Sequence, residues 1–395
     1  MAPRRPPLDG VRVLDLTRLL PGGYATLMLA DLGAEVIKIE DPRGGDPTRD
    51  FPPRVDGTSV YFQVLNRNKR SVTLDLRSPG AAAVLDALAA GSDVLVESFR
   101  PRTARRLGVD AASVRARHPR LVHCSITGFG QTGPYAERPA HDINYVALAG
   151  LFGVDERDAA EPRVPRMLLA DIGAALSAAS AILAGLFARE RTGEGSTIDV
   201  PIHEAALSWL LFPAARWLVD GSERDPAELP ITGHEACYNV YRTADDRFIA
   251  LGALETKFWT VFCERVGRAD LSPLQFAGGE TQARMRDEVA AIFRGATLQA
   301  WLDRFRDVDI CLTAVNSVPE ALADPHLAAR GAIVDRDGTR FIRMPIVFAS
   351  PGDETHAVRV PVQPAPALGA DTDAVLAAAG LDEAARARLR TARIV

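Results

Sequence analysis

The sequence predicts an α/β protein with a large domain, built on a Rossmann-like and mostly parallel sheet, and a smaller α+β domain. In the first half, short apolar segments alternate with Ala/Leu-rich segments of helical spacing, which is the pattern of βαβ units. A polar stretch that contains proline, residues 220–231, then separates this half from a hairpin-like pattern. The chain has 395 residues and is 47% hydrophobic, so it can form two cores.

The strands and helices of the large domain follow from turn residues and apolar spacing. Strands are expected at residues 11–16, 34–39, 71–74, 93–97, 121–127 and 198–200. Helices are expected at residues 21–32, 78–90, 166–191 and 202–220. The second of these helices should begin with Ser78 as its N-cap and Pro79 at the first helical position.

The domain boundaries are expected near the polar stretch and near its counterpart further along the chain. The large domain would comprise residues 1–220 together with a C-terminal return, residues 326–395. The small domain would comprise residues 221–325. It would begin with a hairpin at 238–254 and continue with helices at 256–266, 281–294 and 297–305.

The composition argues against several classes of protein. A net charge of −5 is unfavourable for nucleic-acid binding. No apolar run of about 18 residues is evident, so neither a membrane span nor a membrane partner is expected. The four cysteines are far apart and have no metal-ligand spacing with the seven histidines. We therefore expect a cytoplasmic protein with reduced thiols and no metal site.

A glycine motif follows one predicted strand. Residues 128–133 read Gly-Phe-Gly-Gln-Thr-Gly, which matches GxGxxG. A dinucleotide site would require a helix to begin on this loop in the first βα unit, but Pro134 follows at once. The motif is better interpreted as a loop whose backbone approaches a ligand closely.

Three acidic positions and one histidine are candidates for chemistry. His141 and Asp142 precede an apolar helical run, where Asp142 could simply be an N-cap and His141 a surface residue. Asp171 is the only acid between Arg163 and Arg189, so it is either a helix cap or a carboxylate with a shifted pKa. Glu255 ends the predicted hairpin and could equally be an ordinary loop charge.

Basic residues gather in two segments near predicted strand ends. One is residues 66–70 with Arg77 beyond it, and the other is residues 100–106, which includes Arg100 and Arg106. In an acidic protein such clusters suggest phosphate recognition, although solvated loops would look the same.

The order and spacing of these motifs resemble the class III CoA-transferase superfamily, which also contains the α-methylacyl-CoA racemases. The resemblance covers nearly the whole chain. It rests on residues 8–16 (LDGVRVLDL), 30–40 (ADLGAEVIKIE), 66–70 (NRNKR), 97–101 (ESFRP) and 128–134 (GFGQTGP). The segment His141-Asp142-Ile143-Asn144-Tyr145 resembles the racemase branch, as does Glu255 in its hairpin.

The resemblance implies the roles of individual residues. His141 and Asp171 would be the two acid/base groups of a racemase that removes and returns the proton α to a thioester carbonyl. Asp142 and Glu255 would orient His141 and tune its pKa. The resemblance also implies a set of residues that contact the acyl-CoA substrate: Leu76, Arg77, Arg100, Arg106, Tyr145 and Tyr238.

The resemblance also implies an interlocked homodimer in which Glu255 completes the site of the other subunit. Coenzyme A would arrive as part of the substrate, and no other cofactor is expected. Two alternatives stay open. Asp171 could be the nucleophile of a CoA-transferase that forms an acyl-aspartyl anhydride, or the chain could bind CoA without turnover.

Overall fold

The computed structural model describes residues 5–55, 57–154, 162–222, 230–350 and 353–395. The chain forms two compact units: a large unit of Met1–Phe212 and Gly331–Val395, and a small unit of Pro213–Arg330. The boundaries predicted from the sequence were at residues 220/221 and 325/326, close to these. Most of the expected linker, at 223–229, lies outside the described residues.

A six-stranded sheet, parallel throughout, forms the centre of the large unit. Its order is β5-β2-β1-β6-β7-β8, which is 3-2-1-4-5-6 when the strands are counted along the chain, the order of a Rossmann sheet. The predicted fold class is confirmed. The strands are β1 Arg12–Leu16, β2 Glu35–Glu40, β5 Lys69–Thr73, β6 Val94–Glu97, β7 Val122–Thr127 and β8 Thr197–Pro201.

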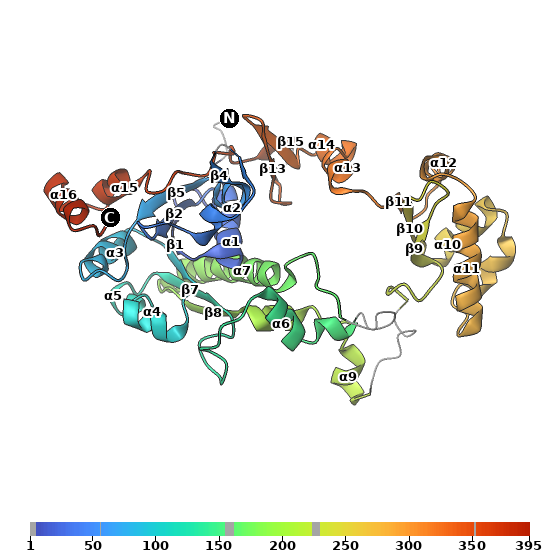
Figure 1. Cartoon of the computed structure of the whole chain (residues 1–395), viewed down its shortest axis with the longest axis horizontal. Helices are drawn as coiled ribbons and strands as arrows, with labels where there is room; N and C mark the ends of the chain where they lie inside the picture. The colour runs from blue at the N-terminus through green and yellow to red at the C-terminus, as the bar shows by residue number, and fades with distance from the viewer. Residues whose placement is uncertain (1–4, 56, 155–161, 223–229, 351–352) are drawn as a thin grey trace. The chain divides into compact units, whose positions relative to one another are not determined.

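Helices cover both faces of this sheet (Figure 1). Successive side chains of a strand point to opposite faces, and apolar side chains on both faces are buried under the helices. Val13 belongs to one core and its neighbour Leu14 to the other. The first core holds α1 Leu19–Asp31, α6 Asp142–Leu148, α7 Leu169–Thr192 and α8 Ile202–Ser208. The second core holds α3 Ala81–Ala90, α4 Pro101–Leu107, α5 Ala111–Arg117 and α15 Thr372–Ala378.

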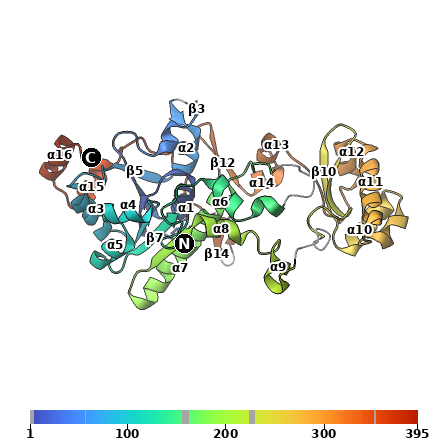
Figure 2. The same ribbon diagram turned by 60° about the horizontal axis from the view of Figure 1, so that its bottom comes forward.

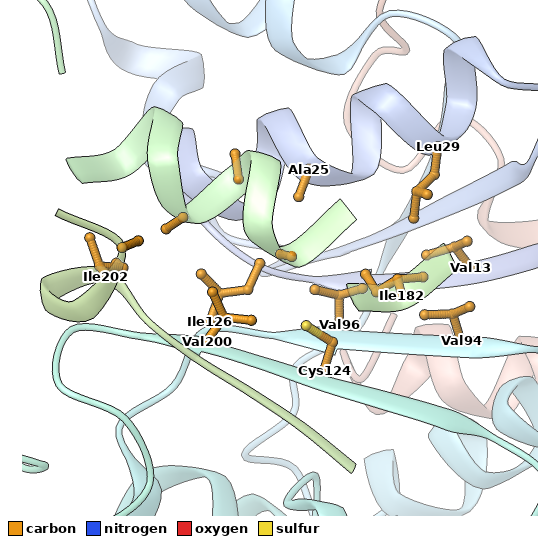
Figure 3. Packing of buried hydrophobic residues seen from close by; sticks show 14 of the residues in the cluster. Val13, Ala25, Leu29, Val94, Val96, Cys124, Ile126, Ile182, Val200 and Ile202 are labelled. Carbon is orange, nitrogen blue, oxygen red and sulfur yellow. The ribbon is translucent and has the colours of Figure 1, made fainter. Parts of the chain in front are cut away.

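The helix α7 is the long helix of the first core. Small residues such as Ala174 and Ala178 are fully buried on it, and Ile182 packs beside Val96 and Cys124 of the sheet (Figure 3). By length and composition α7 could span a membrane, so the expectation that the sequence holds no such apolar segment was wrong. Its contacts with α1, α8, β7 and β8 are those of a core helix. Figure 2 shows α6 and α8 beside α7.

The C-terminal segment returns to the large unit and covers the exposed edge of β5. Asp371 and Ser71 exchange hydrogen bonds, and the Thr73 amide donates to Thr372 Oγ1 at 3.1 Å. An edge strand covered in this way cannot pair with another chain. The elements of the return before and after α15 are β12 Ile333–Arg336, β13 Thr339–Ile342, β14 Phe348–Ser350, β15 Asp353–Val358 and α16 Glu383–Thr391.

Two predicted helix boundaries were wrong for local reasons. Helix α3 begins at Ala81 after Gly80, so Ser78 is not its N-cap; residues 78–81 form a turn in which the Ala81 amide donates to the Ser78 carbonyl. The expected helix at 202–220 is two helices, α8 and α9 Ala215–Asp220. Pro213 lies between them, and proline removes a helix hydrogen bond. The remaining short elements before α9 are β3 Arg54–Val55, β4 Thr58–Ser59 and α2 Val60–Asn66.

The small unit packs helices on a three-stranded antiparallel sheet of order β11-β10-β9. The predicted hairpin is confirmed as β9 Tyr238–Arg242 and β10 Phe248–Gly252, whereas the third strand, β11 Leu312–Ala314, was not predicted. Buried Trp259, Phe262 and Phe293 form stacked rings in its core. Besides α9, this unit contains α10 Thr256–Arg265, α11 Glu280–Arg294, α12 Leu298–Arg304, α13 Val318–Leu322 and α14 Pro325–Ala329.

A buried cluster of charges joins β1, β2, β5 and α1. The Lys69 ammonium lies 3.1 Å from Asp15 Oδ2 and 3.0 Å from the Gly23 carbonyl of α1, while Lys38 lies 2.9 Å from Asp46. Burial lowers the pKa of Lys69 to about 8. Burial opposes ionisation of Asp15 as well, but Lys38 and Lys69 hold the pKa of its carboxyl well below its usual range. Asp15 is therefore the counter-charge that makes two buried lysines tolerable.

We expect Asp15→Asn to lower the free energy of unfolding by about 3 kcal/mol or more at pH 7, because it leaves two buried ammonium groups without their shared carboxylate. Urea unfolding followed by circular dichroism measures this loss. The loss should shrink as the pH falls below about 4, because Asp15 of the unfolded chain becomes protonated there while the folded carboxylate stays ionised to lower pH, so the wild type itself loses the stability that this charge contributes. The control Asp9→Asn alters an exposed pair with Arg5 and should change stability by less than about 1 kcal/mol. Equal effects of the two substitutions would contradict this account.

Candidate active site

A cavity of about 240 Å³ opens at the carboxyl ends of four strands. Its wall takes Leu16 from β1 and Ile39 from β2, and Leu74 and Phe99 follow β5 and β6. Strand β1 pairs with β2 on one side and with β6 on the other, and the chain adds strands outward from β1 in both directions. The cavity therefore lies at the point where the strand order reverses. Ligands of open α/β sheets bind at such a point.

Charged side chains of both signs line this cavity, but they are not equally available. Arg77 donates to Asp41 and Asp75, at 3.0 and 3.2 Å, so its charge is already matched. Among the described residues, Arg18 and Arg106 form no ion pair, and both line the cavity. They are the cations that an anionic ligand would meet without displacing a partner.

A second cavity, of about 260 Å³, lies at the opposite edge of the sheet, between α3 and α15. Its charged residues Arg12, Glu35 and Arg70 pair with one another, since Glu35 accepts from both arginines. Arg70 also pairs with Asp371 at 3.2 Å, so two carboxylates match the two arginines and leave no unpaired charge for a ligand. The cavity at the carboxyl edge is therefore the better candidate for binding.

Two helix N-termini meet beside that edge and bring two acids together. Asp171 is the third residue of α7, and its amide donates to Asp142 Oδ1 at 3.0 Å. Asp142 is buried, and Asp171 is partly buried among small apolar residues. Burial, together with the negative charge of Asp142, raises the pKa of Asp171 to about 7. A carboxyl group with this pKa can both accept and give a proton near neutral pH.

Tyr145 lies in the same neighbourhood, on α6. Its hydroxyl donates to the Ala140 carbonyl at 3.1 Å. Burial, with the charge of Asp171 nearby, raises the pKa of Tyr145 to about 12, and Arg100 acts in the opposite direction. A Cβ atom on Gly128 would lie 2.4 Å from the Tyr145 hydroxyl. The first glycine of the GxGxxG loop is thus required for contact with this tyrosine, and no helix begins on the loop.

His141 precedes Asp142 and is the N-cap residue of α6. It is exposed, and its backbone amide donates to Asn144 Oδ1 at 3.0 Å. Asp142 begins the helix proper, so it is not the cap of its own helix; its carboxylate instead accepts from the first turn of α7. Whether the His141 and Asp171 side chains face one space stays a prediction.

Glu255 and Tyr238 lie in the small unit, at one end of the hairpin. Tyr238 pairs with Gly252 across the β9–β10 ladder, and Glu255 follows as the N-cap residue of α10. Both side chains are exposed. They are separated along the chain from the residues of the large unit with which they were predicted to act.

Of the predicted substrate-binding residues, Leu76, Arg77 and Arg106 line the cavity at the carboxyl edge. Arg100 is the N-cap residue of α4, directly after the cavity residue Phe99. Within the described residues, no three His, Cys, Asp or Glu side chains cluster as a metal site would require.

The family model for CoA-transferase family III matches residues 8–372. The chain belongs to this family. It is 34% identical over 370 residues to a succinate–glutarate CoA-transferase of Agrobacterium fabrum, covering 88% of this chain and 91% of the relative. It is 33% identical over 331 residues to the human α-methylacyl-CoA racemase, covering 83% and 82% of the two chains. A solved CaiB/BaiF family protein from Brucella suis matches with a TM-score of 0.83 at 29% identity, covering 95% of this chain and all of that one.

The cavity at the switch point contains charged residues that the sequence did not indicate. They are Arg18, Asp41 and Asp75. Arg18 stands two residues after β1, and Asp41 directly follows β2. The position of a charged residue just past a parallel strand could have identified both, because those strand ends meet at one edge of the sheet.

We expect Asp142→Asn to lower the pKa of Asp171 from about 7 while leaving it above that of an exposed aspartate. The substitution removes a neighbouring negative charge, and the amide oxygen can still accept from the Asp171 backbone. Carbon-13 NMR of protein labelled at the aspartate carboxyl groups measures this pKa, with Asp171→Asn to assign the resonance. An unchanged pKa of Asp171 would show that the charge of Asp142 does not reach it.

Proposed function

We propose that this family III protein is an α-methylacyl-CoA racemase-like isomerase, which interconverts the two configurations of 2-methylacyl-CoA thioesters. The observation that carries the proposal is the environment of Asp171. Burial and Asp142 raise its pKa to about 7, which suits an acid/base group that must take up and return a proton in each cycle. A nucleophilic carboxylate would instead gain from a low pKa, which keeps it ionised at neutral pH.

In the proposed reaction, one base removes the proton from Cα of the thioester and leaves an enolate. A second group, in its acid form, then protonates the opposite face of the same carbon. Asp171 would serve one face and His141 the other. The hydrogen bond between Asp142 and the Asp171 amide supports this assignment, because it holds the start of α6, directly after His141, against the start of α7.

We further propose a homodimer in which Glu255 and Tyr238 of one subunit act at the site of the other. Both side chains are exposed, as residues that complete a second subunit's site would be. The large unit also exposes Phe187, Leu211 and Phe212, each 60% or more. Large apolar side chains exposed to this degree are typical of interaction surfaces.

Coenzyme A would bind as part of the substrate in the cavity at the carboxyl edge, and no further cofactor is proposed. Arg18 and Arg106 would meet its phosphates, because their charges are not already paired. We place the enzyme in the cytoplasm, where its four free cysteines, three of them buried, would stay reduced.

A CoA-transferase is the second candidate. Relatives such as the succinate–glutarate CoA-transferase favour it, since they match this chain as closely as the racemases do. Asp171 would attack the thioester carbonyl, form an acyl-aspartyl anhydride and release the CoA thiolate. This mechanism leaves His141 without a role in the chemistry.

We expect Arg106→Ala to raise KM for an acyl-CoA by about tenfold to a hundredfold and to change kcat little. The lost charge-assisted bond to phosphate is equally strong in the ground and transition states. Steady-state kinetics measure both constants. Arg105→Ala is the matched control, because Arg105 is on the same helix, pairs with Glu137 at 3.8 Å and does not line the cavity. A drop confined to kcat would count against phosphate binding by Arg106.

The decisive test is exchange of the α-proton. Incubation with a 2-methylacyl-CoA in D₂O, without any acceptor acid, should place deuterium at Cα, as followed by mass spectrometry. A racemase must exchange this proton, because its acid/base groups equilibrate with water between turnovers. A transferase does not touch Cα and should leave it unlabelled.

Two variants sharpen this test. His141→Ala should abolish racemisation and can retain exchange from the enantiomer whose proton faces Asp171, whereas Asp171→Ala should abolish activity under either mechanism. For the transferase, His141→Ala would keep most turnover with an added carboxylate, and hydroxylamine would trap an acyl group on Asp171. Trapping by the wild-type protein with no deuterium at Cα would replace the racemase proposal with the transferase.

A further inference from the structure

Glu97 is a buried acid outside the proposed chemistry. It ends β6, beside the point where the strand order reverses, and its exposed fraction is 0%. One carboxyl oxygen, Oε2, accepts from the Phe99 amide at 2.7 Å. The other, Oε1, is buried and has no hydrogen-bond partner among the described residues. A buried carboxylate oxygen without a donor is costly, so this group requires an explanation.

The surroundings of Glu97 hold no cation that would stabilise a negative charge. Among the described residues it forms no ion pair. The charged groups that act on it are Asp110, before α5, and Asp199, on β8, and both are acidic. Ser125, the partner of Glu97 across the β6–β7 ladder, and the Phe99 amide act to lower the pKa of Glu97, but burial outweighs them. Burial also lowers the pKa of His123, which favours its neutral form. On balance, burial and the two acids disfavour ionisation of Glu97.

The loop that Glu97 fastens carries parts of the binding cavity. The Ser98 hydroxyl accepts from the Arg18 amide at 3.2 Å. The Arg18 guanidinium lies over the Phe99 ring, 5.6 Å from its centroid, and both residues line the cavity. Arg100 follows, and its charge reaches Tyr145. One short loop therefore connects the cavity with the tyrosine beside Asp171.

We infer that Glu97 is a positioning residue for CoA thioester binding: it is held as a neutral carboxylic acid, and in that form it fixes the Ser98–Arg100 loop against Arg18. The inference rests on the proposed binding of coenzyme A in this cavity. An ionised Glu97 would be repelled by Asp110 and Asp199 and would draw water to its buried oxygen. The loop would then shift, and Phe99 and Arg18 would leave their places in the cavity wall.

If Glu97 acts in this way, the affinity of the protein for coenzyme A should depend on pH, whichever reaction the enzyme catalyses. Burial raises the pKa of Glu97 to about 7. The Kd for free coenzyme A should therefore be constant below pH 7 and rise by up to about tenfold per pH unit above it, because only the acid form binds well. Free coenzyme A has no acyl carbon, so this measurement does not depend on which reaction the enzyme catalyses. Both proteins in this comparison carry Asp171→Asn, because that substitution removes the other carboxyl group with a pKa near 7.

Isothermal titration calorimetry from pH 6 to 8.5 on the full chain, with and without Glu97→Gln, tests the inference. The glutamine oxygen can still accept from the Phe99 amide, and the side chain cannot ionise, so its Kd at pH 6 should match that of the parent and stay flat to pH 8.5. Two results would overturn the inference and leave the proposed CoA site standing. One is the same pH dependence of Kd in both proteins, and the other is tenfold weaker binding by Glu97→Gln than by the parent at pH 6. Absence of binding by every protein at every pH would overturn the proposed CoA site as well.

Discussion

The buried carboxylate of Asp15 is the constraint on which the large unit depends. Two lysines from neighbouring strands, Lys38 and Lys69, are buried beside it, and Lys69 also binds the Gly23 carbonyl at the start of α1. Removing one partner from a buried charge cluster costs far more than any surface pair contributes. The cluster therefore fixes β1, β2, β5 and α1 as one body. The carboxyl ends of these three strands form one side of the binding cavity.

The other side of the site depends on an interaction between two helix starts. The Asp142 carboxylate accepts a hydrogen bond from the Asp171 amide, which satisfies a backbone donor of α7 and places two carboxyl groups close together. The same proximity raises the pKa of Asp171. A structural contact, the capping of α7, is thus also the cause of a chemical property. Glu97 shows the same principle in a different form, since its burial both holds a loop and disfavours its charge.

Much of the fold could be predicted from local pattern. The six strands of the large sheet and most of the helices that were predicted lie within a few residues of their expected positions, because a strand buried on both faces is apolar throughout and a core helix is apolar at helical spacing. Several short helices, among them α4, α5 and α15, were not predicted. The misses have physical causes. Pro213 divides one expected helix, and the short strand β11 pairs with the distant β10, so nothing nearby in the sequence indicates it. The apolar stretch of α7, which is long enough to span a membrane, was not predicted because small residues and one acid interrupt its apolar pattern.

The sequence by itself determined the alternation of strands and helices, the isolation of Asp171 in an apolar stretch and the resemblance to a CoA-handling family. These are properties of neighbours along the chain. Only the tertiary structure decided that Asp142 caps α7, that Arg18 joins Arg106 in one cavity and that Arg77 is already paired. It also decided that Glu97 is buried without a cation. The physical reason is that desolvation and charge pairing act through space, between residues that the chain brings together only when the sheet has formed.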